Sequence, residues 1–311
     1  MKPIKALLLT FISAFCLMSL SINANTCLSR VSKSNADNKA YLPKVITVHQ
    51  VALENMLRLG LEDQIMAYAL RENDLPAEFM RQAQNITYLS QQMPSREQIF
   101  NAKPDFIYAG HPSAFTPTEL GNAAWWHCKG VATLVNPTAT VKPPMTLTAK
   151  DIWKDIKAVA DRFAVTDRAE KLELQGMKRL DALPKLRTQP RVLVLDAKSV
   201  DLKVASCCGG ADLMVRLAGG DNAADGFDNR WSVISNLSVA QLNPDVIVLA
   251  TYQHGPTDAV LKELMTDPKL SETDAIKRQH IVTLPYTQTL PSPSMLNSIE
   301  KLNQQLVNWG Y

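Results

Sequence analysis

Three histidines are placed where they could bring metal-binding chemistry to the edge of a sheet. His49, His111 and His254 each follow an apolar run that predicts a buried strand. A neutral imidazole is the commonest protein ligand for metals. His127 is a further candidate, beside Cys128. The chain has no HxxxH or CxxC spacing, so a metal site would have to be assembled from distant loops. For each histidine the alternative is a hydrogen-bonded or surface loop residue.

Two adjacent cysteines are the second chemical feature. Cys207 and Cys208 stand directly before two glycines. Adjacent thiols can bridge to each other, ligate a soft metal, or pair elsewhere in the chain. The disulfide candidates are Cys27, Cys128, Cys207 and Cys208, and their spacing does not choose a connectivity. Cys207, Cys208 and His127 are the candidates for direct metal ligation.

Aromatic side chains follow the other predicted strands. Tyr68, Tyr252 and Tyr286 come at or shortly after strand ends, and Trp231 stands in a predicted loop. In open parallel sheets, small molecules bind in the crevice at the carboxyl ends of the strands. We therefore predict that one cleft is lined by His49, His111, Trp231, Tyr252, His254, Tyr68 and Tyr286.

The usual enzyme motifs are absent from the sequence. There is no GxSxG, no P-loop and no GxGxxG after a strand. Cys207 as a nucleophile would need a base such as His254, and the sequence does not show that geometry. We predict a protein that is not an enzyme and has no cofactor of its own.

The elements that would position these candidate residues are predicted as two α/β regions, one on each side of a long helical stretch. Residues 148–186 carry apolar positions at helical spacing, and Pro184 and Pro190 end the pattern. Buried strands are predicted on both sides of it, at 45–48, 65–68, 106–109 and 131–135, and at 192–195, 246–249 and 281–284. We predict an N-terminal α/β lobe over residues 43–164, a linking helix over 165–187 and a C-terminal α/β lobe over 190–311.

The two halves repeat short motifs in the same order. Residues 56–60, MLRLG, correspond to residues 214–219, MVRLAG, and KPDFI at 103–107 corresponds to NPDVI at 243–247. Each match alone is a common helix-to-strand turn. Together they favour two similar lobes.

Composition and the first residues point to an exported globular protein. The chain has 311 residues, of which 46% are hydrophobic and 20% are charged. Residues 1–24 combine two lysines, an apolar run and Ala24, the pattern of a cleavable signal peptide. Cleavage would leave 31 basic and 30 acidic side chains, a balance that argues against nucleic-acid binding. We expect a periplasmic location.

Longer stretches carry a resemblance to a known family. They are VITVHQVALENMLRLGLEDQIMAYAL, LSQQMPSREQIFNAKPDFIYAG, LMVRLAGGDNAADGF, WSVISNLSVAQLNPDVIVLATY and IVTLPY. In this order they resemble the periplasmic substrate-binding proteins of iron-siderophore, haem and cobalamin ABC importers, over roughly residues 43–309.

The resemblance implies a fold, partners and a role. The fold would be two doubly wound, Rossmann-like lobes joined by one long helix, the class III periplasmic binding protein type. The loops that touch the transported molecule in that family map here onto His49, His111, Trp231 and Tyr252. The partners would be a small-molecule metal chelate, an ABC permease and its ATPase, and the protein would act as a monomer.

The transported molecule stays open at this stage. The predicted rim is richer in His, Cys, Tyr and Trp than in the arginines that grip anionic ferric siderophores. A ferric siderophore, haem, a cobalamin-like corrinoid and a small complex of a softer metal are all compatible with it. A second hypothesis is a periplasmic metal- or thiol-handling protein that uses Cys207 and Cys208.

Overall fold

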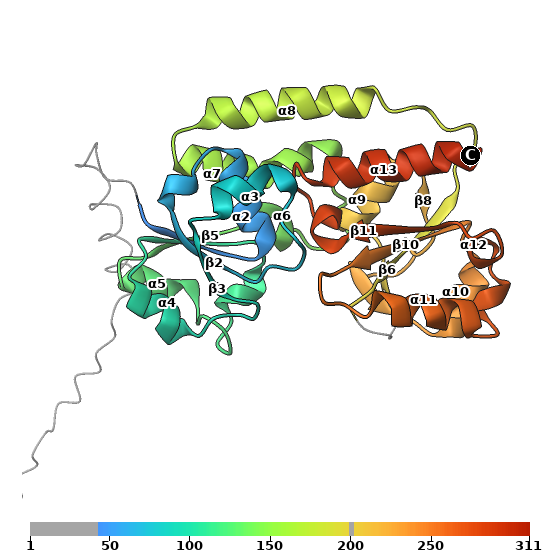
Figure 1. Ribbon diagram of the computed structural model, residues 1–311, viewed down its shortest axis with the longest axis horizontal. Coiled ribbons are helices and arrows are strands. Elements are labelled where there is room, and N and C mark those ends of the chain that lie inside the picture. Colours follow the sequence, from blue (N-terminus) through green and yellow to red (C-terminus); the bar gives the residue numbers. More distant parts are fainter. Residues whose placement is uncertain (1–42, 199–201) are drawn as a thin grey trace, which may run out of the picture.

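Two α/β lobes lie side by side along the long axis of the molecule (Figure 1). The computed structural model describes residues 43–198 and 202–311. The predicted signal peptide and Cys27 lie outside these described residues. Within them, no helix has the length and apolar character needed to cross a bilayer.

Five parallel strands form the sheet of the N-terminal lobe, in the order β3-β2-β1-β4-β5. They are β1 (Val45–Val48), β2 (Ile65–Ala69), β3 (Thr87–Ser90), β4 (Phe106–Ala109) and β5 (Ala132–Val135). The strands predicted at 45–48 and 106–109 are confirmed at both ends. β3 was not predicted, because this edge strand is largely exposed and lacks an apolar run.

Helices cover both faces of this sheet. They are α2 (Gln50–Arg58), α3 (Ala77–Ala83), α4 (Arg96–Ala102), α5 (Ala123–Cys128), α6 (Pro137–Thr140) and α7 (Lys154–Arg162). Successive residues of β1 point to opposite faces, so Val45 packs against α2 and α7 while Ile46 packs against α4 and α5. The sheet is thus buried on both sides, as the unbroken apolar strands predict.

The sheet of the C-terminal lobe is mixed. Its path is β11-β10-β6-β7-β9, and β8 pairs with β6 off this path. The strands are β6 (Arg191–Asp196), β7 (Lys203–Ala205), β8 (Asp221–Asn222), β9 (Trp231–Val233), β10 (Val246–Thr251) and β11 (Ile281–Pro285). β6, β10 and β11 run parallel, whereas β7 is antiparallel to both β6 and β9. The prediction of a loop at Trp231 is wrong, since this residue begins β9.

The helices of the C-terminal lobe again lie on both faces, where their apolar sides fill two core clusters. They are α9 (Gly210–Leu217), α10 (Asn236–Leu242), α11 (Thr257–Thr266), α12 (Asp274–Lys277) and α13 (Met295–Asn308). The two-lobed, doubly wound α/β fold predicted from the sequence is therefore confirmed. The antiparallel strands β7 and β9 are a local departure at one edge.

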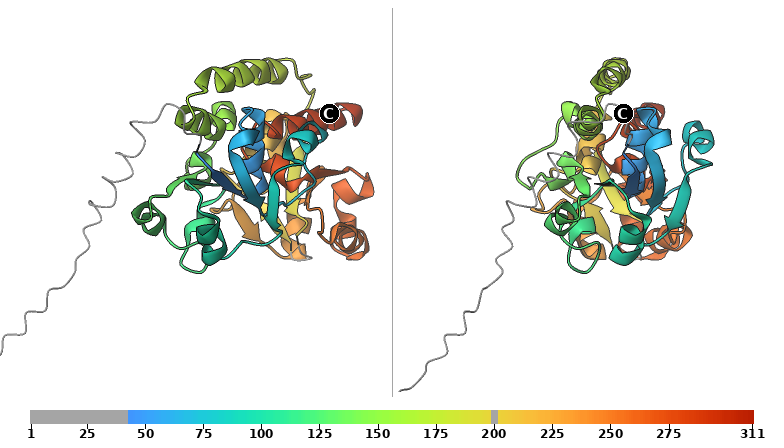
Figure 2. Two further views of the ribbon diagram at one scale, coloured as in Figure 1. Left: turned by 60° about the vertical axis from the view of Figure 1, so that its left-hand side comes forward. Right: turned by 90° about the vertical axis from the view of Figure 1, so that its left-hand side faces the viewer.

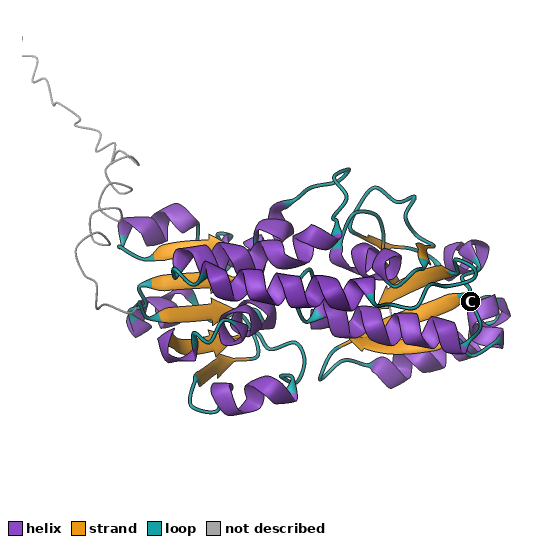
Figure 3. Ribbon diagram, turned by 90° about the horizontal axis from the view of Figure 1, so that it is seen from above, coloured by secondary structure: helices purple, strands orange, loops and turns teal. Residues whose placement is uncertain are grey.

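One long helix, α8 (Thr166–Asp181), runs above both lobes and connects them (Figures 1 and 2). Its 16 residues span about 24 Å. Arg168 donates to the carbonyl oxygen of Leu59 at 2.6 Å in the N-terminal lobe, and Arg179 pairs with Glu300 of α13 at 2.7 Å in the C-terminal lobe. Leu172 packs against the cores of both lobes. The helix is thus fastened at both ends, and Figure 3 shows it crossing the junction between the two sheets.

The segment before α7 also crosses the junction. The helical pattern predicted from residue 148 begins with a 3-10 turn (Ala149–Trp153), and α7 follows it. The backbone N–H and hydroxyl of Thr148 both donate to Asp151 at 2.8 Å, which caps the start of this turn. Trp153 packs into the core of the C-terminal lobe. A Cβ at Gly176 would lie 2.1 Å from the Trp153 ring, so this glycine lets α8 approach the turn closely.

Candidate functional site

A cleft of about 970 Å³ lies between the two lobes. Its walls are the loops at the carboxyl ends of strands from both sheets, where doubly wound folds bind small molecules. Six of the residues predicted from the sequence line it: His49, His111, Trp231, Tyr252, His254 and Tyr286. Folding therefore brings together side chains that are up to 237 positions apart in the sequence.

Two predicted residues lie elsewhere. Tyr68 is inside β2 rather than after it, is only 6% exposed and packs against Tyr88 with ring centroids 5.0 Å apart. His127 is on α5, where its Nε2 atom lies 2.9 Å from the Thr133 hydroxyl. Neither residue lines the cleft.

The adjacent cysteines Cys207 and Cys208 are joined to each other by a disulfide in the loop between β7 and α9. The following glycines line the cleft, whereas neither cysteine does. A disulfide offers no thiolate, which is the form that ligates soft metals. Cys128 is also disulfide-bonded. In the part of the chain that the structure describes, no three His, Cys, Asp or Glu side chains gather to hold a metal ion.

Two imidazoles line the cleft on the side of the N-terminal lobe. The rings of His49 and His111 lie 6.3 Å apart between centroids. His49 is the residue between β1 and α2, and its Nδ1 atom lies 2.9 Å from the carbonyl oxygen of Val48. Burial, with a smaller contribution from the nearby His111, lowers the pKa of His49 to about 4, although the hydrogen bond to Val48 raises it. Burial also lowers the pKa of His111. Both rings are therefore neutral at pH 7.

Three aromatic side chains form the opposite wall. Tyr252 and Tyr286 stack with centroids 4.7 Å apart and planes inclined by 20°. Trp231 lies 6.4 Å from Tyr286. Burial raises the pKa of both tyrosines well above the ordinary value, so both hydroxyls keep their protons. The wall presents large apolar faces with a few polar edges, which suits a flat or aromatic molecule.

Charged side chains of both signs also face the cleft. Lys203 pairs with Asp196 at 3.2 Å, and Arg71 donates to Gln253 of the opposite lobe at 3.2 Å. Burial raises the pKa of Glu72 to about 7, so its carboxyl is only partly ionised at neutral pH. The cations thus outweigh the anions near neutral pH, and the cleft favours a neutral or anionic molecule over a cationic one.

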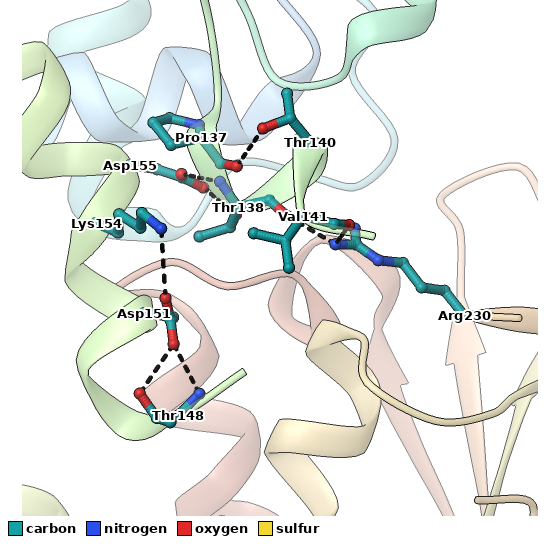
Figure 4. Close-up of polar contacts among 9 residues, drawn as sticks. All are labelled: Pro137, Thr138, Thr140, Val141, Thr148, Asp151, Lys154, Asp155 and Arg230. Atoms are coloured by element: carbon teal, nitrogen blue, oxygen red, sulfur yellow. Dashed lines mark hydrogen bonds and ion pairs between the residues drawn. The ribbon is translucent and has the colours of Figure 1, made fainter. Parts of the chain in front are cut away.

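The short helix α6 is held between the lobes by one side chain at each end (Figure 4). Asp155 of α7 accepts from the backbone N–H of Thr138 at 2.8 Å and from its hydroxyl at 2.6 Å. Arg230, which precedes β9 in the other lobe, donates to the carbonyl oxygens of Thr138, at 2.9 Å, and of Val141. The Asp155 carboxyl thus caps the start of α6, and the Arg230 cation at its end complements the backbone dipole. Arg230 and Asp155 were not singled out from the sequence.

A buried polar seam joins the lobes behind the cleft. Asn73 accepts from the backbone N–H and the hydroxyl of Thr287 at 3.1 Å each, and it donates to the carbonyl oxygen of Thr251 at 2.8 Å. Glu54 of α2 accepts from the hydroxyl of Ser294 in the other lobe. Together with α8 and the hydrogen bonds of Arg230, these bonds limit how far the lobes can separate.

The chain matches a family model described as "Periplasmic binding protein" over residues 45–287. No curated protein matches the chain. Solved structures are similar in fold.

Three of these structures show how far the likeness extends. A periplasmic binding protein from Veillonella parvula has a TM-score of 0.77 at 22% identity, covering 86% of this chain and 92% of its own. An ABC-type Fe3+-hydroxamate transport system protein from Saccharomonospora viridis has a TM-score of 0.72 at 22% identity, with 85% and 93% covered. The periplasmic heme-binding protein RhuT from Roseiflexus has a TM-score of 0.70 at 19% identity, with 87% and 100% covered.

Proposed function

Because this chain belongs to the periplasmic binding protein family, we propose that it is the solute-binding subunit of an ABC importer for a metal chelate. It captures the chelate, here called the cargo, in the periplasm and delivers it to a membrane permease and its ATPase. Proteins of this family bind solutes rather than transform them, and the cleft needs no covalent chemistry to do so.

The cleft between the lobes carries this proposal. Its volume of about 970 Å³ is at the upper end of small-molecule sites. Its stacked tyrosines and Trp231 offer apolar faces to a macrocycle or an aromatic chelator, and its imidazoles offer polar nitrogen groups to the metal or to the chelator. Similar structures include proteins named for Fe3+-hydroxamate transport and for heme binding, which favours the same class of cargo.

The remaining assignments are part of the same proposal. Residues 43–164 and 190–311 act as the two lobes, residues 165–187 link them, and residues 1–24 direct export to the periplasm. The cargo contacts His49, His111, Trp231, Tyr252, His254 and Tyr286. The protein works as a monomer and docks on the permease.

The alternative role, thiol or metal handling by Cys207 and Cys208, is less well supported. Both sulfur atoms are used in one disulfide, and neither residue lines the cleft. We therefore do not advance it as a second function.

Binding titrations test the proposal. The mature protein is titrated with ferric tris-hydroxamate, iron(III) protoporphyrin and cobalamin, and the tryptophan fluorescence is followed. We expect at least one of them to bind with a micromolar or lower dissociation constant. Tyr252→Ala is expected to weaken that binding about tenfold, the effect of losing about 1.4 kcal/mol of contact.

Tyr311→Ala is the matched control, because the Tyr311 ring packs against His280 in the C-terminal lobe and neither residue lines the cleft. Its dissociation constant should equal that of the unaltered protein. Binding weaker than millimolar for every chelate, or equal losses in the two variants, would refute the assignment of the cleft.

A further inference from the structure

The backbone of His49 has a conformation that glycine adopts easily and other residues avoid. Its φ is 75° and its ψ is 139°, close to a region that is almost exclusive to glycine. The conformation is fixed from both sides, since the N–H of His49 donates to Ala69 and its carbonyl accepts from Ala52, both at 3.1 Å. Such strain persists where the side chain serves a purpose, so an imidazole at this position calls for an explanation.

The neighbouring strand leaves room for this residue. Gly110 follows β4, and a Cβ placed on it would lie 3.0 Å from the Cβ of His49 and 2.6 Å from Val51. A side chain at position 110 would therefore collide with the side chains of His49 and Val51. The absence of a side chain at Gly110 thus leaves room for the His49 side chain beside the cleft.

Hydrogen bonds fix which nitrogen of His49 faces the cargo. The Nδ1 atom lies 2.9 Å from the carbonyl oxygen of Val48. A carbonyl can only accept, so Nδ1 carries the hydrogen and Nε2 keeps its lone pair. A histidine that donates one ring N–H to a backbone carbonyl is the usual arrangement for metal ligation through the other nitrogen.

His111 has the opposite tautomer. Its Nδ1 atom accepts from the backbone N–H of Ser113 at 3.2 Å. An amide N–H can only donate, so Nδ1 holds the lone pair and Nε2 carries the hydrogen. The two rings thus present unlike groups to the cleft, and only His49 can bind a metal without first breaking a hydrogen bond.

A bare ion would find too few partners here. Within residues 43–198 and 202–311 no three ligating side chains converge, whereas metal ions in proteins usually take four or more donors. A metal that arrives inside a chelate brings most of its donors with it. One imidazole is then enough to complete its coordination.

Building on the proposed function, we propose that His49 Nε2 binds the metal of the cargo directly, at a coordination position left open or filled by exchangeable water. The lone pair of Nε2 forms the new bond and the water leaves. No proton or electron is transferred, because Nε2 carries no hydrogen. His111 donates its Nε2 hydrogen to an oxygen or nitrogen of the chelator. The protein therefore selects chelates whose metal is incompletely wrapped.

Matched pairs of chelates test this selection. One pair is the iron(III) complex of a tetradentate bis-hydroxamate, with two open positions, and that of a hexadentate tris-hydroxamate, with none. The other pair is iron(III) protoporphyrin and metal-free protoporphyrin. In the pair that fits the cleft, we expect the open iron complex to bind at least tenfold more tightly than its counterpart and to change its visible absorption on binding.

Variants assign the effect to one ring. His49→Ala is expected to lose both the tenfold preference and the absorption change, whereas His111→Gln keeps the absorption change and binds more weakly. His49→Gly repeats the first test with a residue that suits the local backbone, in case the alanine variant folds poorly.

The outcomes separate the two proposals. If the members of a pair bind equally tightly, or the absorption change survives in His49→Ala and His49→Gly, direct ligation by His49 is wrong while the transport role stands. If none of the four compounds binds better than millimolar, direct ligation by His49 is wrong, and if cobalamin does not bind either, the transport proposal fails with it.

Discussion

Because the backbone of His49 is strained, we predict that glycine at this position gives a more stable protein than alanine. Both variants lose the imidazole and its bond to Val48, so they differ only in the Cβ atom. At a φ of 75° and a ψ of 139°, a residue with a Cβ costs about 1–3 kcal/mol. Glycine costs about 0.5–1 kcal/mol more conformational entropy on folding.

The difference favours His49→Gly over His49→Ala by about 1 kcal/mol in the free energy of unfolding, which corresponds to roughly 1.5–2 °C in the thermal midpoint of a protein of this size. Urea unfolding followed by circular dichroism measures it. Ala124→Gly, at an exposed position of helix α5, is the control. There glycine should lower stability by about 1 kcal/mol. If His49→Gly is no more stable than His49→Ala, the backbone at this residue is not strained and the reasoning from strain to function is refuted.

Three further outcomes are expected. Burial raises the pKa of Asp155 from 3.8 to about 7, so its contribution to stability is complete below pH 3.8 and is lost as the pH rises through about 7. Between pH 4 and pH 8 the urea midpoint should therefore fall less in Asp155→Asn than in the unaltered protein, and parallel curves would contradict this. Arg230→Ala removes the hydrogen bonds to the carbonyl oxygens of Thr138 and Val141, so amide hydrogen exchange in α6 should become about tenfold faster. Unchanged exchange would show that Arg230 does not stabilise this helix. Replacing Cys207 and Cys208 by serine should leave the dissociation constant of the best chelate within about threefold, since neither cysteine lines the cleft; a loss of binding would give the disulfide a part in cargo recognition.

The sequence identified the parts of the fold that depend on burial of continuous apolar strands. β1 and β4 were predicted to the residue, because a strand covered by helices on both faces must be apolar at every position. β7 and β9 escaped prediction because each has three residues and takes its stability from antiparallel pairing with a neighbour far away in the sequence.

Much of the candidate site was predicted from the rule that small molecules bind at the carboxyl ends of the strands. Residues after strands, such as His111 and Tyr286, do line the cleft, whereas Tyr68 does not because β2 extends one residue further than its apolar run suggested. Asp155 was missed because a carboxylate within a helical pattern usually faces solvent. Asp155 is only 1% exposed because α6 folds over it. The spacing of residues along the helix does not predict this tertiary contact.

The tautomers of His49 and His111 cannot be predicted from the sequence. They follow from a carbonyl acceptor at Val48 and an amide donor at Ser113, which face the rings only in the folded chain. The sequence does place an imidazole at residue 49 and a glycine at residue 110. The strain that makes the pair informative appears only in the backbone angles.

Native mass spectrometry of the mature protein, purified from the cells that make it, tests the central claim most directly. The account predicts one releasable metal chelate per chain, absent from a variant with Trp231 and Tyr252 both changed to alanine. A protein that carries no small molecule when isolated, and that takes up no metal chelate when the growth medium is extracted and offered to it, would contradict the claim that the cleft between the lobes is a chelate-binding site.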